Sequence, residues 1–276
     1  MGRAGDDLID RFDGTRALRT LRLAPTNELV AYAAEVTDSS DRPTLTVSFS
    51  ADCADRAADI GAAVEATLLT DRSALRALAA ADEPVAQLVR RYPGIVPLLY
   101  RDPFTALIRS ISAQQVNLRW AATVRARLAQ RYGTRRLVGG WEVWSLHPEP
   151  LAVARVEELR ELQLTTAKAL SVVDVARAVQ AGELRLSGLD ALDDEQVIAH
   201  LTGLRGIGLW SAEWFLARTL GRPRVVAGDL GVRKAIGRLY RTPVTPSELE
   251  VRRLTAHWGA AATHAQALAL HDLTQP

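Results

Sequence analysis

The spacing of apolar residues divides the chain into two parts near residue 70. Before this point, short alternating or β-branched segments are separated by turns rich in Pro, Asn, Asp and Ser, a pattern typical of antiparallel strands. The predicted strands span 17–23, 29–36 and 44–50, and helical spacing over 54–66 predicts a helix packed on them. We therefore expect residues 1–70 to form a small antiparallel sheet domain with one helix.

From residue 71 onward the spacing is almost entirely helical, with short Gly, Pro and Asp turns between segments. The predicted helices span 73–80, 84–92, 104–115, 118–132, 151–162, 167–180, 194–202, 209–220, 230–241, 247–257 and 260–273. The segment 133–150 lacks a helical pattern, and we expect an irregular connection between two helical lobes there. The predicted fold class is α+β, mainly α, with residues 71–276 forming a two-lobed helical domain.

Composition limits the chemistry that the chain can carry. The 276 residues are 48% hydrophobic with a net charge of +2, so any surface that binds a polyanion must be local. The single Cys53 excludes an intramolecular disulfide and a four-cysteine iron–sulfur cluster. The N-terminus is acidic and lacks the apolar core of a signal peptide, and no apolar run is long enough to span a bilayer. We expect a cytoplasmic protein without a membrane partner.

The segment 201–240 carries the most specific chemical signal. Its glycines Gly203, Gly206 and Gly208 allow positive φ, so the backbone can turn sharply with no Cβ between it and a ligand. The first N–H groups of the helix that follows, 209–220, have no partner inside that helix. Together with the amides of the turn they form an anion site suited to a DNA phosphate.

Asp229 stands directly before the predicted helix 230–241 and has two interpretations. As an N-cap it would stabilise that helix by about 1 kcal/mol. As a carboxylate in a poorly hydrated cleft it would stabilise positive charge on a deoxyribose whose N-glycosidic bond is breaking. It could instead activate the water that attacks C1′. The two uses of the carboxylate are compatible.

Three ordered motifs resemble the helix-hairpin-helix DNA glycosylases, and among them the 3-methyladenine DNA glycosylase II (AlkA) type. The first is the hairpin LTGLRGIGLWSAEW, the second is VVAGDLGVRK around Asp229, and the third is Asp102-Pro103-Phe104 followed by ISAQQV. The likeness covers roughly residues 64–272 and places the helix-hairpin-helix at about 195–220. It assigns the catalytic role to Asp229.

The resemblance implies a glycosylase that flips alkylated bases, such as 3-methyladenine or 7-methylguanine, out of double-stranded DNA in base excision repair. It also implies a monomeric, bacterial enzyme associated with the nucleoid when bound to DNA. Two alternatives stay open. One is a glycosylase for oxidised or deaminated bases, and the other is a non-catalytic helix-hairpin-helix protein that only binds DNA.

Trp210 bears on strand cleavage. Relatives that also cut the strand have a lysine at this position, whose amine forms a Schiff base with the sugar. The only lysines here, Lys168 and Lys234, do not match it, so the resemblance implies a monofunctional enzyme. Trp210 is either a core residue or a pocket wall, and an indole face would favour a cationic alkylated purine by about 1–2 kcal/mol.

The C-terminal part departs from the family pattern. AlkA-type enzymes tend to carry a second pocket aromatic in a W-x-P-[YW]-R-S-like segment, where this chain has Ala261. We therefore expect a wider base pocket, with Trp214 and Tyr100 as replacement walls. His264 is interpreted as a surface or packing residue.

Gln114 and Gln115 follow the apolar stripe of helix 104–115. They are either surface glutamines at a helix end or parts of the wedge that fills the gap left by an extruded base. The resemblance favours Gln115 as the wedge, with Gln114 supporting the same turn.

The remaining candidates concern the DNA backbone. We expect phosphate contacts from the amides of Gly206, Gly208 and Trp210 and from the side chains of Ser211, Arg233 and Lys234. The resemblance also implies a sodium or potassium ion, held by main-chain carbonyls of Thr202, Leu204 and Ile207. The arginine run comprising Arg125, Arg127, Arg131, Arg135 and Arg136 is interpreted as a solvated helix face, with a DNA role as the alternative.

Overall fold

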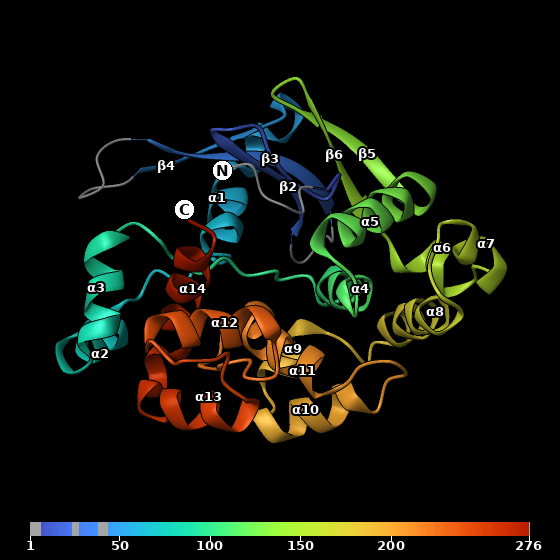
Figure 1. The fold of residues 1–276 in the computed structure, drawn as a ribbon. Coiled ribbons are helices and arrows are strands. Elements are labelled where there is room, and N and C mark those ends of the chain that lie inside the picture. Colours follow the sequence, from blue (N-terminus) through green and yellow to red (C-terminus); the bar gives the residue numbers. More distant parts are fainter. Residues whose placement is uncertain (1–6, 24–27, 38–43, 276) are drawn as a thin grey trace.

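A small sheet lies at one end of a larger helical body in the computed structural model, which describes residues 7–23, 28–37 and 44–275 (Figure 1). The sheet is antiparallel in the order β1–β2–β3–β4. Its strands are β1 (Asp10–Phe12), β2 (Arg16–Leu23), β3 (Glu28–Thr37) and β4 (Thr44–Phe49). The three predicted strands are confirmed, and β1 is an addition. The predicted turns at 25–27 and 38–43 lie outside the described residues.

The two faces of the sheet pack on different partners. Val30 and Tyr32 in β3 pack with Ile60 and Val64 of α1 (Ala57–Glu65), which confirms the predicted helix. The residues between them, such as Ala31, point to the opposite face because side chains alternate along a strand. There they meet Val138 and Val143.

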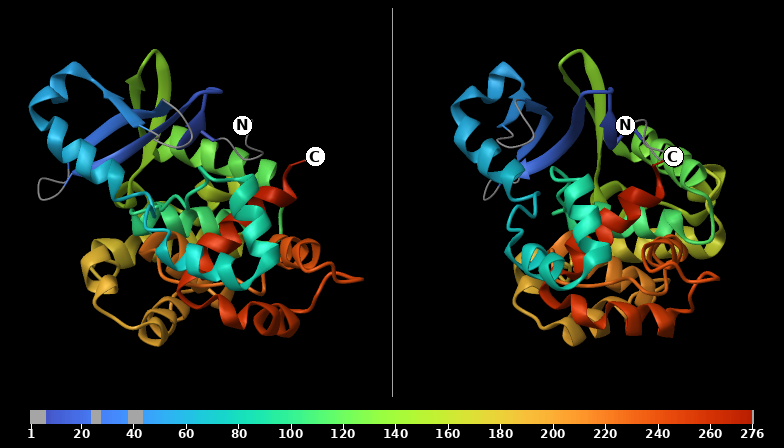
Figure 2. Two further views of the ribbon diagram at one scale, coloured as in Figure 1. Left: turned by 90° about the vertical axis from the view of Figure 1, so that its left-hand side faces the viewer. Right: turned by 60° about the vertical axis from the view of Figure 1, so that its left-hand side comes forward.

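These valines belong to a β-hairpin, so the prediction of an irregular connection at 133–150 is wrong. The strands β5 (Gly133–Val138) and β6 (Trp141–Leu146) pair directly. Gly139 and Gly140 have φ of +55° and +80°, the two positive values that a two-residue type I′ turn requires. The hairpin crosses beside the sheet in both views of Figure 2, so residues from the middle of the chain complete this end of the molecule.

The helical body has two cores, but the boundary between them does not lie at 133–150 as predicted, because helices on both sides of that segment share one core. One core contains residues of α4 (Pro103–Ala113), α5 (Leu118–Tyr132), α6 (Pro148–Ala152), α7 (Val156–Glu161), α8 (Thr166–Gln180), α9 (Leu186–Asp190), α10 (Asp194–Thr202) and α11 (Leu209–Phe215). The other contains residues of α2 (Ser73–Ala81), α3 (Glu83–Arg91), α12 (Leu230–Leu239), α13 (Glu248–Thr255) and α14 (Ala262–Leu273).

Several helices differ from the prediction. The expected helix 151–162 is two short helices, α6 and α7, and α9 was not predicted at all. The helix that was expected to reach Gln115 ends at Ala113. Helix α11 continues through a π-helical turn, Leu216–Leu220, and contributes side chains to both cores. Among the described residues, no helix has the length and apolar character needed to cross a bilayer.

The turn between α10 and α11 is tight at one glycine. Gly206 has φ of +74°, and a Cβ there would lie 2.1 Å from the Oγ of Ser171 in α8. Gly203 and Gly208 have φ of −68° and −101°, so positive φ is confirmed at Gly206 alone. Gly206 is therefore required both by its backbone conformation and by the closeness of α8.

We expect Gly206→Ala to lower the free energy of unfolding by about 2–4 kcal/mol, from the left-handed backbone and the overpacking against Ser171. Gly208→Ala is the matched control, because a Cβ there meets open space. Urea unfolding of both variants measures the difference. Equal midpoints for the two would contradict this account of the turn.

Candidate catalytic site

Asp229 caps α12 and is half-buried. Its Oδ1 accepts the N–H of Val232 at 3.0 Å, and its main-chain carbonyl accepts the N–H of Arg233 at 2.8 Å. The preceding residues Val226 and Ala227 are buried in the second core, so the chain enters the helix from a fixed position. The capping interpretation is confirmed, and it uses only one of the two carboxylate oxygens.

Two tryptophans hold the other oxygen. The Nε1 of Trp210 donates to Asp229 Oδ2 at 2.9 Å, and the Nε1 of Trp214 donates to the same atom at 3.3 Å. The two indoles are four residues apart in α11 and therefore lie on the same face of the helix. Both are partly buried against the second core. The structure thus brings three of the predicted site residues together around one carboxylate.

Glu213, which lies between these tryptophans in the sequence, was not among the predicted site residues. It is 2% exposed, and its Oε1 accepts from Arg252 of α13 at 2.9 Å. The sequence signal that could have identified Glu213 is an acidic residue within a mainly apolar helical segment. This ion pair, in which the glutamate is buried and the arginine is partly exposed, joins α11 to α13.

Tyr100 lies in a different cluster. Its hydroxyl donates to Asp10 Oδ2 at 3.0 Å, and the guanidinium of Arg109 lies 4.5 Å from its ring centroid. Arg19 and Arg218 also lie over this ring. These contacts place Tyr100 between the sheet and the helical body. Of the three predicted pocket aromatics, Trp210 and Trp214 donate to Asp229, whereas Tyr100 donates to Asp10.

At the C-terminal position where the family pattern has a second aromatic residue, Ala261 is packed in the second core. Ala261 is 1% exposed in the second core, beside Trp258, whose Nε1 donates to the Tyr240 hydroxyl. His264 is buried, with its Nε2 3.0 Å from the carbonyl oxygen of Leu69. The interpretation of His264 as a packing residue is confirmed.

The turn after α4 contacts the turn between α10 and α11. Gln114 Nε2 donates to the carbonyl of Gly206 at 2.8 Å, and the carbonyl of Gln114 accepts from Lys168 Nζ at 2.7 Å. Gln115 is exposed with φ of +56°, a left-handed conformation that is uncommon for a residue other than glycine. The turn thus holds Gln114 against the protein and directs Gln115 outward.

Two candidates for phosphate contacts have other partners. Ser211 is 1% exposed and accepts a hydrogen bond from Ser110 Oγ at 2.8 Å, so its hydroxyl does not reach the surface. Arg233 Nε donates to the carbonyl of Pro246. Lys234 is exposed, as are Gly206 and Gly208. The side chain of Ser211 is therefore unsuited to the predicted contact, because α4 covers it.

The carbonyls predicted to hold a cation lie at the end of α10 and in the turn that follows it. Thr202 ends α10, and the Leu204 carbonyl accepts the N–H of Ile207 at 3.1 Å, which leaves it a second lone pair. Neutral carbonyl oxygens are a donor set for a weakly held monovalent cation. Among the described residues, no cluster of three or more His, Cys, Asp or Glu side chains could hold a metal.

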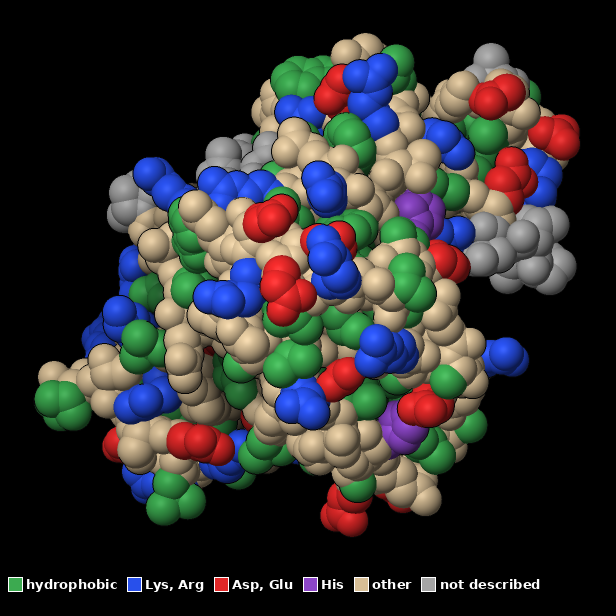
Figure 3. All heavy atoms as spheres, turned by 90° about the vertical axis from the view of Figure 1, so that its right-hand side faces the viewer, with side chains coloured by type: hydrophobic (Ala, Val, Ile, Leu, Met, Phe, Trp, Pro, Cys, Tyr) green, Lys and Arg blue, Asp and Glu red, His purple; other side chains and the backbone are tan. Residues whose placement is uncertain are grey.

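The arginine run does not form one face. Arg125 is 4% exposed, so the interpretation of it as solvated is wrong, whereas Arg131, Arg135 and Arg136 are exposed. On the face shown in Figure 3, basic side chains are spread out and mixed with acidic ones. Positive charge on this face is dispersed.

Several known proteins have similar sequences. The DNA-3-methyladenine glycosylase of Bacillus subtilis is 26% identical over 183 residues, which cover 66% of this chain and 60% of that protein. DNA-3-methyladenine glycosylase 2 of Escherichia coli is 32% identical over 130 residues, 46% of this chain and 43% of that one. The matches span only 60% of the length of two Bacillus subtilis relatives.

Among solved structures, the 3-methyladenine DNA-glycosylase from Archaeoglobus fulgidus is 25% identical, with a TM-score of 0.79 over 96% of this chain and 89% of that one. The family described as HhH-GPD superfamily base excision DNA repair protein matches residues 108–260, which is more than half of the chain and includes the second half of α4, the turn between α10 and α11, and Asp229. The chain therefore belongs to the HhH-GPD superfamily of base excision DNA repair proteins.

Proposed function

We propose that this protein is a monofunctional DNA glycosylase that releases alkylated bases from double-stranded DNA by hydrolysis. The observation that carries the proposal is the Asp229 carboxylate, held by a helix N-terminus on one oxygen and by two indole N–H groups on the other. The names of the similar Bacillus, Escherichia and Archaeoglobus proteins support the same activity. We further propose that it acts as a cytoplasmic monomer.

In this reaction the N-glycosidic bond breaks and its electron pair leaves with the base. An alkylated purine carries positive charge, so it departs as a neutral molecule. Positive charge then develops on C1′ and O4′, and the fixed Asp229 carboxylate stabilises it. Water adds to C1′ and its proton passes to the carboxylate or to solvent, which leaves an abasic site.

Access to this bond requires an extruded nucleotide. Exposed Gln115 is suited to fill the gap in the stack, because the turn holds its neighbour Gln114 on Gly206. The amides of the hairpin and of the first turn of α11 would bind a phosphate. The carbonyls of Thr202, Leu204 and Ile207 would hold a monovalent cation, which adds positive charge beside that phosphate.

The Asp229→Asn variant tests the catalytic role. Asn is also a good N-cap, so α12 keeps its start while the negative charge is lost. We expect the single-turnover rate of 7-methylguanine release to fall by about 100- to 10,000-fold, with duplex affinity nearly unchanged.

Asp82→Asn is the matched control, because Asp82 also caps a helix through Val85 and accepts two side-chain hydrogen bonds, from Tyr240 and His257. Base release at the wild-type rate by Asp229→Asn would overturn the proposed mechanism. Absence of release by the wild-type protein would instead favour a non-catalytic DNA-binding protein.

A borohydride experiment tests the absence of lyase chemistry. Burial lowers the pKa of Lys168. Its Nζ donates to the carbonyls of Ser112 and Gln114 and so holds residues 114–117, called here the wedge turn. We expect no covalent protein–DNA product after borohydride treatment of a reacting mixture. A trapped product that disappears in Lys168→Gln would show that this amine attacks C1′.

Side-by-side assays define the lesion range. Attraction of the indole faces to cationic purines predicts release of 3-methyladenine and 7-methylguanine in preference to neutral hypoxanthine and 8-oxoguanine. The assay uses one duplex sequence with each base in turn. Faster release of 8-oxoguanine or hypoxanthine would replace alkylation with oxidation or deamination as the damage recognised.

A further inference from the structure

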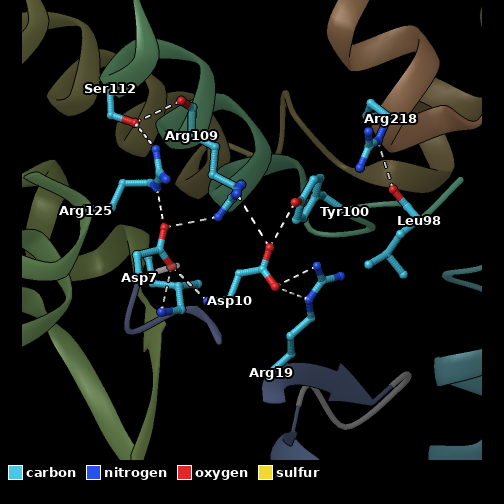
Figure 4. Close-up of polar contacts among 10 residues, drawn as sticks. Asp7, Asp10, Arg19, Leu98, Tyr100, Arg109, Ser112, Arg125 and Arg218 are labelled. Carbon is cyan, nitrogen blue, oxygen red and sulfur yellow. Dashed lines mark hydrogen bonds and ion pairs between the residues drawn. The ribbon is translucent and has the colours of Figure 1, made fainter. Parts of the chain in front are cut away.

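A buried cluster of charged side chains joins the segment before β1 to the helical body (Figure 4). Its centre is Asp7, whose carboxylate is fully buried. Asp7 Oδ1 accepts the backbone N–H groups of Ile9 and Asp10 at 2.9 and 2.8 Å, which fixes the carboxylate relative to the start of the sheet. Asp7 Oδ2 points the other way, toward two arginines.

These arginines come from the two helices on either side of the wedge turn. Asp7 Oδ2 lies 2.5 Å from the Nε of Arg125 in α5 and 3.3 Å from an Nη of Arg109 in α4. Arg125 also donates to Ser112 Oγ at 3.0 Å, and that hydroxyl donates to the carbonyl of Arg109. The Asp7 carboxylate thus connects α4 to α5, the two helices joined by residues 114–117.

A second carboxylate extends the cluster to the sheet. Asp10 Oδ2 accepts from Tyr100 and lies 3.6 Å from Arg109, while Asp10 Oδ1 pairs with Arg19 of β2 at 2.7 Å. Arg109 therefore contacts both aspartates. The sheet, α4 and α5 share one polar network that crosses the boundary between them.

Stability alone does not account for this network. Buried ion pairs lose so much hydration that apolar residues of similar volume are often as stable or more stable. Charged groups differ from apolar ones in having fixed directions and partners, so they select one relative placement of the elements that carry them. Here those elements are α4 and α5, whose ends define the turn with Gln114 and Gln115.

The distance along the chain from the cluster to the wedge is short. Ser112 lies in the last turn of α4, and Gln115 follows three residues later. The backbone between them is held from the other side by Lys168, which donates to the carbonyls of Ser112 and Gln114. A shift of α4 against α5 would therefore move the exposed Gln115 side chain.

We propose that Asp7 is a positioning residue for base extrusion: by pairing with Arg109 and Arg125 it sets the wedge turn, without touching DNA or the reacting sugar. This inference rests on the proposed function. It gives the N-terminal sheet segment a role in the reaction, because the residues beside Asp7 anchor the carboxylate that sets the turn.

The test compares two substrates. The first carries 7-methylguanine paired with cytosine in a duplex, and the second carries it opposite a strand that cannot pair around the lesion, where extrusion costs little. For Asp7→Asn we expect the release rate to fall on the order of tenfold on the paired duplex. On the unpaired substrate the rate stays close to wild type, because Asp229 is untouched.

Asp82→Asn is again the matched control, a buried aspartate with several partners in the other lobe. It should leave the ratio of the two rates unchanged. Equal slowing of Asp7→Asn on both substrates, or an unchanged ratio, would overturn the positioning role. If Asp7→Asn fails to fold by circular dichroism, Ser112→Ala removes the hydroxyl that links Arg125 to α4 and must lower the same ratio.

A double-mutant cycle with Gln115→Ala separates positioning from general loosening. If Asp7 acts through the wedge, Asp7→Asn has little further effect on the paired duplex once Gln115 is alanine. Multiplicative losses in the double variant would show that the two residues act independently. Absence of release by the wild-type protein on both substrates would contradict the proposed function itself.

Discussion

The carboxylate of Asp229 unites the structure of the second lobe with the chemistry proposed for it. One oxygen caps the N-terminus of α12, and the other accepts hydrogen bonds from two indole N–H groups of α11. A carboxylate in a half-buried place needs such hydrogen-bond partners, because they replace the water that burial removes from it. Both helices must therefore start where they do: a shift of either one by a residue would remove donors from the carboxylate.

The hairpin and the wedge turn form a second unit that depends on close packing. Gly206 lies against Ser171 of α8, and its carbonyl accepts the side chain of Gln114. Lys168, three residues before Ser171, binds the carbonyl of Gln114 from the same helix. Helix α8 thus supports the turn between α10 and α11 together with the turn at residues 114–117, and it fixes the distance between these two turns.

Sequence reasoning succeeded where one local pattern determined the contact. The cap at Asp229 follows from an aspartate before an apolar helical run, and the shared face of Trp210 and Trp214 follows from their spacing. It failed where the partner comes from a distant element. Ser110 covers the hydroxyl of Ser211, and Asp10 and three arginines surround Tyr100, contacts that no local pattern indicates.

Two further misses had a local signal. The pair Gly139-Gly140 between apolar residues is a hairpin signature, and helical spacing elsewhere in this part of the chain obscured it. Arg125 stands within the apolar stripe of α5, with Val124 and Leu128 buried beside it, and such a position requires a buried acid nearby. The acid is Asp7, more than a hundred residues away, and no spacing rule identifies it.

Part of the basic content of this chain, whose net charge is only +2, is used inside the protein. Arg19, Arg109 and Arg125 neutralise buried aspartates inside the protein and contribute nothing to an external field. Under the proposed function, contact with phosphates depends on oriented backbone N–H groups, which act at hydrogen-bond distance and not through long-range attraction. Internal charge then sets the geometry of the turn that carries Gln115, and neutral amides bind the DNA strand.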